Sequence, residues 1–174
     1  MKEYNKPIAT LRELLDYNAQ KFTAAEVELR NNLPKWIAQV SSQKLKSALE
    51  GYYKVVQEHV HKFEKFFEAE EINSFATANK IMLAFIDDTE ERLTRCANQD
   101  VKDACLLACI QEINHFKISL YGTAAAFAKE LEMGEFARRF HEAEADEKEI
   151  DQKLNELAKH GINSDAEVPI ILSM

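Results

Sequence analysis

The sequence has little of what builds turns, sheets and membrane spans. Only four glycines and three prolines occur among 174 residues, while Ala, Glu, Lys and Leu are abundant, so we expect an almost entirely α-helical protein. No run reaches the roughly 18 to 20 apolar residues of a membrane span, and the first residues lack the apolar core of a signal peptide. These absences predict a cytoplasmic protein without a membrane partner.

Positive charge and reactive motifs are also scarce. Lys and Arg number 22 against 30 Asp and Glu, and the resulting net charge of -8 would repel a phosphate backbone, so nucleic acid is not an expected partner. Cys96, Cys105 and Cys109 have no zinc or redox spacing and are interpreted as small core residues. No nucleotide fingerprint, phosphate-binding glycine loop or nucleophile–base pair supports an enzyme outside metal–oxygen chemistry.

What the sequence does contain is apolar residues at spacings of three and four, the signature of amphipathic helices. We expect one domain over residues 1–161 and a C-terminal tail over 162–174. Asp100 is a candidate N-cap and Gly134 a candidate C-cap. The expected helices cover 7–40, the stretch from the break at Ser41 and Ser42 to Phe66, a shorter segment 74–96, 100–133 and 136–161.

One charge interrupts the most apolar of these patterns. Lys117 stands in the middle of a stripe formed by Leu106, Ile110, Ile113, Lys117, Leu120, Ala124, Phe127 and Leu131. A buried ammonium is unfavourable by several kcal/mol unless carboxylates meet it, so Lys117 predicts acids that face inward from neighbouring helices.

Each of the other long patterns also has a polar interruption about midway. Glu26 lies on the first stripe, Tyr52 and His59 on the second, and Glu147 on the last, with Glu142 and Asp146 beside it. A lone histidine on an apolar seam is more often a hydrogen-bonded core residue than a metal ligand, and both interpretations of His59 stay open. The expected polar core layer comprises Glu26, Tyr52, His59, His115, Lys117, Glu142 and Glu147, with His115 placed near the core on the flank of its helix.

Four long amphipathic helices with a shared polar level predict a four-helix bundle. The connection between the second and third long helices holds the short helix and is long enough to cross the bundle. The expected fold is therefore all-α and ferritin-like, with an additional short helix in the single long crossover.

Several segments together resemble one family. The stretches "FTAAEVELRNNLPKW", "SSQKLKSALEGYYKVVQEHVHKFEKFFE", "INHFKISLYGTAAAFAKELEM" and "HEAEADEKEIDQKLNELAKHG" are similar, in this order, to the YciE/YciF family of ferritin-like stress-associated bacterial proteins. The resemblance covers most of the chain up to the tail. It rests on the order of the segments, because no single motif is specific.

The resemblance implies a carboxylate site for two metals in the bundle core, from which this chain departs. Glu26, Glu142, Asp146 and Glu147 match acidic positions of the family on the first and last helices. The family has a His-Leu-Glu-Glu-Thr type segment where this chain has residues 52–56, and Glu-His-Tyr-Glu where it has residues 114–117. The carboxylates of the second and third long helices are therefore missing, and a lysine stands at one of the ligand positions.

We interpret Lys117 as an electrostatic substitute for metal, paired with Glu26 and with Glu142 or Glu147. In the alternative, the lysine stem runs along the bundle and carries the ammonium to the surface.

Three functions follow from these patterns. The first is a non-enzymatic, stress-associated bundle that forms a homodimer and holds no cofactor. The second is an oxidase or peroxide-handling protein that binds iron, manganese or zinc through Glu26, His59, Glu142 and Asp146, with His115 nearby. The third is an interaction module that uses exposed helix faces or the apolar run 168–172.

Overall fold

The computed structural model describes residues 7–69 and 78–167, and within these ranges the chain is helical without any strand. Five long helices follow one another, and a π-helical turn, Ala158–Ile162, and the short α6, Asn163–Asp165, come after them. The long helices are α1 (Leu11–Ile37), α2 (Gln43–Ala69), α3 (Lys80–Arg95), α4 (Gln99–Glu130) and α5 (Gly134–Leu157).

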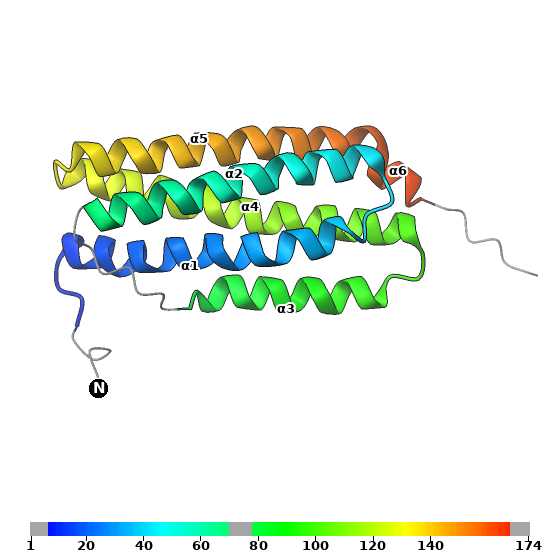
Figure 1. Ribbon diagram of the computed structural model, residues 1–174, viewed down its shortest axis with the longest axis horizontal. Coiled ribbons are helices and arrows are strands. Elements are labelled where there is room, and N and C mark those ends of the chain that lie inside the picture. Colours follow the sequence, from blue (N-terminus) through cyan, green and yellow to red (C-terminus); the bar gives the residue numbers. More distant parts are fainter. Residues whose placement is uncertain (1–6, 70–77, 168–174) are drawn as a thin grey trace, which may run out of the picture.

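The helices α1, α2, α4 and α5 form a four-helix bundle (Figure 1). Both α1 and α5 pack against α2 and α4, and each of these neighbours runs antiparallel to the helix it contacts. The helix α3 lies outside the bundle against α1 and α4, and it carries the chain back along the bundle between α2 and α4. This single long crossover confirms the predicted all-α, ferritin-like fold with its extra helix.

Side-chain caps correct several predicted helix ends. Thr10 accepts a hydrogen bond from the backbone N–H of Glu13, so α1 begins at Leu11 and not at residue 7. Asn98, not Asp100, caps α4, because its Oδ1 lies 2.9 Å from the N–H of Val101. Gly134 is the first residue of α5, and the residue with positive φ after α4 is Glu132.

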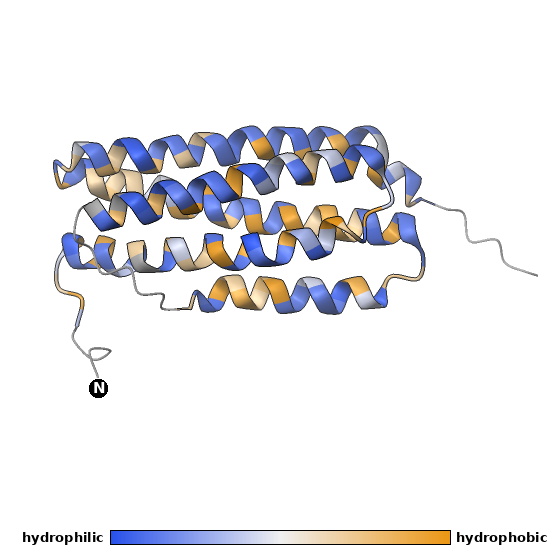
Figure 2. Ribbon diagram, in the orientation of Figure 1, coloured by the Kyte–Doolittle hydropathy of each residue, from blue (hydrophilic) through white to orange (hydrophobic). Residues whose placement is uncertain are grey.

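Two apolar clusters fill the bundle, one toward each end. The first contains Trp36, Leu49 and Ile113 among others, and the second is rich in aromatic rings, including Phe22, which lies 5.2 Å from Phe140 between ring centroids. Polar and apolar residues alternate along each helix, as expected for amphipathic helices around a shared core (Figure 2). The polar side chains at the level between the clusters form the candidate site.

The last helix ends in a distorted turn. His160 and Gly161 leave helical φ and ψ after Leu157, yet Ile162 is again buried and belongs to the first apolar cluster. The apolar run 168–172 lies outside the described residues. Within the described part of the chain, none of the helices combines the length and the apolar character that crossing a bilayer requires.

The link between α1 and α2 is fixed by a buried carboxylate of α4. Asp103 Oδ2 accepts hydrogen bonds from the backbone N–H of Ser42 and from the hydroxyl of Ser41, both at 2.7 Å, and from the Ser41 N–H at 3.1 Å. Its side chain therefore satisfies donors that the start of α2 would leave unpaired.

We expect Asp103→Ala to lower the free energy of unfolding by about 2–3 kcal/mol, because it leaves these donors without a charged acceptor. Urea denaturation measures the change. Asp100→Ala, an exposed acid in the first turn of the same helix, is the control and should change the value by less than about 1 kcal/mol. Equal effects of the two variants would contradict the assigned role of Asp103.

Candidate functional site

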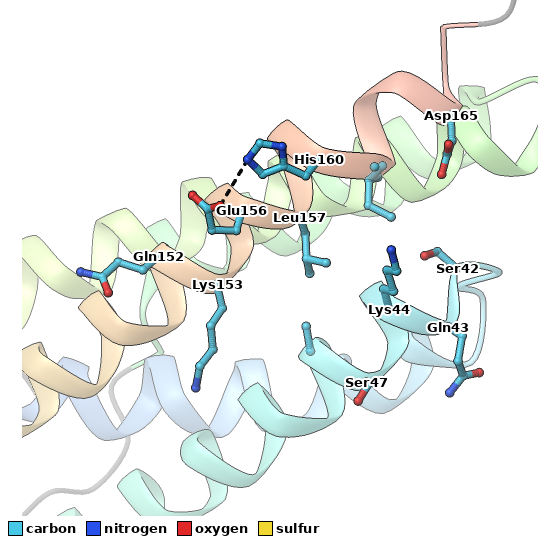
Figure 3. Close-up of a pocket in the computed structure, with 13 residues that line it drawn as sticks. Ser42, Gln43, Lys44, Ser47, Gln152, Lys153, Glu156, Leu157, His160 and Asp165 are labelled. Carbon is cyan, nitrogen blue, oxygen red and sulfur yellow. Dashed lines mark ion pairs between the residues drawn. The ribbon is translucent and has the colours of Figure 1, made fainter.

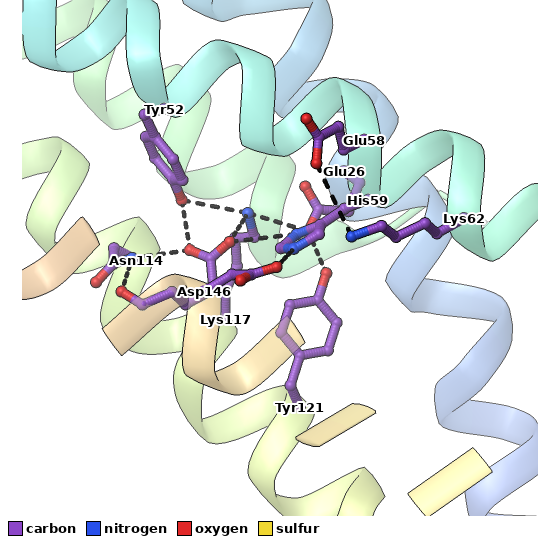
Figure 4. Close-up of polar contacts among 10 residues, drawn as sticks. Glu26, Tyr52, Glu58, His59, Lys62, Asn114, Lys117, Tyr121 and Asp146 are labelled. Carbon is purple, nitrogen blue, oxygen red and sulfur yellow. Dashed lines mark hydrogen bonds and ion pairs between the residues drawn. The ribbon is translucent and has the colours of Figure 1, made fainter. Parts of the chain in front are cut away.

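Lys117 is completely buried in the centre of the bundle, on α4. Its Nζ lies 3.0 Å from Oε1 of Glu26 on α1 and 2.6 Å from Oε1 of Glu147 on α5 (Figure 4). The ammonium also donates a hydrogen bond of 3.2 Å to the hydroxyl of Tyr52 on α2. Lys117 therefore pairs with Glu147 and not with Glu142, and the alternative in which its ammonium reaches the surface is wrong.

Glu147 is held by donors from two further side chains. Tyr52 donates its hydroxyl proton to Oε2 at 2.8 Å, and Asn114 Nδ2 donates to the same oxygen at 2.8 Å and to the backbone carbonyl of Glu147 at 3.0 Å. Because every group in contact with this carboxyl is a donor, the arrangement suits its ionised, acceptor-only form.

His59 on α2 connects the buried level with the surface. Its Nδ1 lies 3.1 Å from Oε1 of Glu26, and its Nε2 lies 3.1 Å from Oδ2 of Asp146, whose side chain is 42% exposed. Since both ring nitrogens face carboxylates, the doubly protonated imidazolium satisfies both contacts. Tyr121 donates a further hydrogen bond to Glu26.

The surroundings fix the charge of this layer. Burial would lower the pKa of Lys117, but Glu147 and Glu26 outweigh it and raise that pKa well above its usual value. Burial would raise the pKa of Glu26, but Lys117, His59 and Tyr121 together lower it to about 2. For Glu147, burial raises the pKa although Lys117 opposes the shift. With both carboxyls ionised, one ammonium and one imidazolium balance them.

Two predicted members of the layer lie elsewhere. The side chain of His115 is 64% exposed and contacts Asp151 on α5 at 2.8 Å, so its expected place near the core is wrong. Glu142 is 47% exposed and pairs with Arg138 one turn earlier, at 2.5 Å. Asp146 reaches the layer only at its rim, through His59.

The sequence interpretation missed Asn114 and Tyr121, which are both fully buried. Asn114 lies three residues before Lys117 and Tyr121 four residues after it, so both share its face of α4. The predicted stripe had Ile113 and Leu120 in their places. The spacing from Lys117 was the signal that could have found them.

Comparison with known proteins places the chain in a family. The model of a domain of unknown function, DUF892, matches residues 10–167. The chain belongs to the DUF892 family. This DUF892 protein is 28% identical over 145 residues to protein YciF of Escherichia coli K12, covering 83% of this chain and 87% of YciF.

Two solved structures share the fold of this DUF892 protein. YcfI from Rhodopseudomonas palustris has a TM-score of 0.83 at 25% identity, covering 87% of this chain and 97% of its own. The E. coli stress protein YciF also has a TM-score of 0.83, at 24% identity, covering 90% of this chain and 99% of its own.

The centre of the layer resembles a metal site only in part. Ligand atoms of Glu26, His59 and Glu147 lie within 4.8 Å of one another, a spacing at which three ligands can hold an ion. However, the Lys117 ammonium is in contact with both carboxylates at the same place. The residues therefore do not fit a divalent cation while Lys117 keeps this position, because the two positive charges would repel each other.

The charge of His59 predicts a pH dependence. Burial would lower its pKa, but the hydrogen bonds to Asp146 and Glu26 raise it from 6.5 to about 9. Because this pKa is higher in the folded state than in the unfolded state, protonation of His59 stabilises the folded protein fully below pH 6.5. The stabilisation is lost as the pH rises through about 9. We expect the free energy of unfolding to fall by about 3 kcal/mol across this window, and His59→Gln to remove most of the dependence in urea titrations. A pH profile shared by both proteins would contradict the charged state.

Removing the ammonium should be strongly destabilising. Lys117→Met leaves the buried carboxylates of Glu26 and Glu147 with only the His59 imidazolium to balance them, and we expect a loss of about 3–5 kcal/mol in the free energy of unfolding. Lys148→Met, which removes a half-exposed lysine from a surface ion pair, should lose less than about 1 kcal/mol. The double variant Lys117→Met/Glu147→Gln should recover part of the loss. If the two single variants behaved alike, Lys117 would not compensate the carboxylates.

Proposed function

We propose that this DUF892 protein is a non-enzymatic, stress-associated ferritin-like bundle in which Lys117 supplies the positive charge that metal ions supply in carboxylate bundles. The observation that carries the proposal is the position of the fully buried Nζ, 3.0 Å from Glu26 and 2.6 Å from Glu147. No diffusible ion is then needed to balance the two acids.

The neighbouring residues support this assignment. Two divalent ions in a bundle core need several anionic oxygens, which di-metal carboxylate proteins take from all four helices. Here α2 and α4 contribute Tyr52, His59, Asn114 and Lys117 to the layer, and none of these is a carboxylate. The ion-pair network then specifies how the helices pair and in which register, a role that does not require a net gain in stability.

The physiological part of the proposal rests on relatives. YciF of E. coli is described as a stress protein, and its similarity to this chain extends over most of both sequences. We propose the same association here, together with the homodimeric state and the cytoplasmic location predicted from the sequence.

Metal binding is the competing function, and two observations favour it. Glu26 Oε2 is buried and has no hydrogen-bond partner among the described residues. A small cavity of about 10 Å³ between α2 and α5 is lined by His59, together with Lys62, Phe63, Arg139 and Asp146 among others. This volume is about that of one water-sized probe. An iron, manganese or zinc ion would need Lys117 to move away first.

Metal content after expression with added iron, manganese or zinc separates these functions. We expect the parent protein to carry far less than one ion per chain, because Lys117 repels a cation at the only carboxylate pair in the described core. Lys117→Glu, which removes this charge and adds a carboxylate, should bind metal, whereas the surface variant Lys148→Glu should not. Near-stoichiometric metal in the parent protein would end the proposal.

A further inference from the structure

A large groove at one end of the bundle takes no part in the charge layer. It lies between the first turns of α2 and the last turns of α5 and has a volume of about 1020 Å³ (Figure 3). This is at the upper limit of the roughly 300–1,000 Å³ of small-molecule pockets. The groove is open to solvent along its length, so its shape suits an extended segment better than a compact ligand.

The surface of the groove is mixed in character. Ala48 on α2 and Leu157 at the end of α5 are partly exposed and provide apolar surface, while Ile162 in the following turn is 4% exposed. Lys44 and Lys153 also line the groove, and their aliphatic stems add apolar contact area while the ammonium groups stay in water. Charged groups also line the groove, and Glu156 pairs there with His160 at 3.3 Å.

The chain itself brings an apolar segment to this groove. Asp165, at the end of α6, is one of the lining residues, and the described chain continues only to residue 167. The next five residues are Val-Pro-Ile-Ile-Leu, a run that would expose aliphatic surface to water if nothing covered it. The DUF892 match also ends at residue 167.

We propose that residues 168–172 dock in the groove between α2 and α5 of their own chain. Five extended residues span roughly 17 Å, and the α-helical part of the α5 side of the groove, from Gln152 to Leu157, spans about 8 Å at the helical rise. The segment is therefore long enough to cover it. Pro169 disfavours helical backbone at the residue before it, which suits an extended path.

Docking within the chain is favoured over docking on a second copy. Only two residues separate Asp165 in the groove wall from Val168. With so short a tether, the effective concentration of the apolar run at the groove is on the order of millimolar. A partner's segment would have to displace this tethered one.

Hydrogen exchange of the full-length protein tests the docking with one variant in the apolar run and one in the groove. Ile171→Asp places a charge in the apolar run and should speed exchange of the amides of Ala158–Ile162 about tenfold, whereas Ser173→Asp should not. Ala48→Arg fills the groove and should speed exchange of residues 170–172 by a similar factor. Gln57→Arg adds the same charge on an exposed part of α2 and is its control.

The outcomes separate the proposal from its alternatives. Reciprocal effects of Ile171→Asp and Ala48→Arg, with an unchanged oligomeric state in sedimentation, would support docking within the chain. Unchanged exchange in both variants, with the fold intact by circular dichroism, would overturn it. Faster exchange that accompanies dissociation of a dimer would also overturn it, because the segment would then dock on a second copy.

Discussion

The structure depends on one buried cation. Lys117 of α4 contacts Glu26 of α1 and Glu147 of α5, and α2 joins the same network through Tyr52 and His59. Removing so many charges from water is costly, and attraction inside a protein often only offsets that cost. The network is therefore better understood as a constraint on which helices meet, and in which register, than as a source of stability.

This constraint also explains how the core is organised. An aromatic-rich apolar cluster lies on one side of the polar level and a larger aliphatic cluster on the other. Sliding one helix by a turn would place Glu26, Lys117 or Glu147 in one of these clusters without a partner, which is far more unfavourable than a lost apolar contact. The pairing of opposite charges thus selects a single alignment from the many that similar apolar seams would allow.

Much of the fold could be predicted from spacing alone, because long four-three patterns specify helices and a long crossover specifies the topology. Glu26, His59, Lys117 and Glu147 were identified because each interrupts such a pattern. His115 and Glu142 were misplaced and Asn114 and Tyr121 missed, since an apolar pattern alone leaves the phase of a helix uncertain by one residue. The observed row of α4 is Asp103, Leu107, Ile110, Asn114, Lys117, Tyr121, Ala124 and Ala128.

That row could not be distinguished from the predicted one before packing was known, because α4 contacts α1, α3 and α5 and is therefore apolar on several faces. The central claim remains that the ammonium of Lys117 stands between Glu26 and Glu147 where a metal ion would otherwise bind. An anomalous difference map from crystals grown with manganese tests it most directly. The account predicts no anomalous peak in the layer and Nζ at ion-pair distance from both Glu26 and Glu147. A manganese peak between these carboxylates, with the lysine displaced, would contradict it.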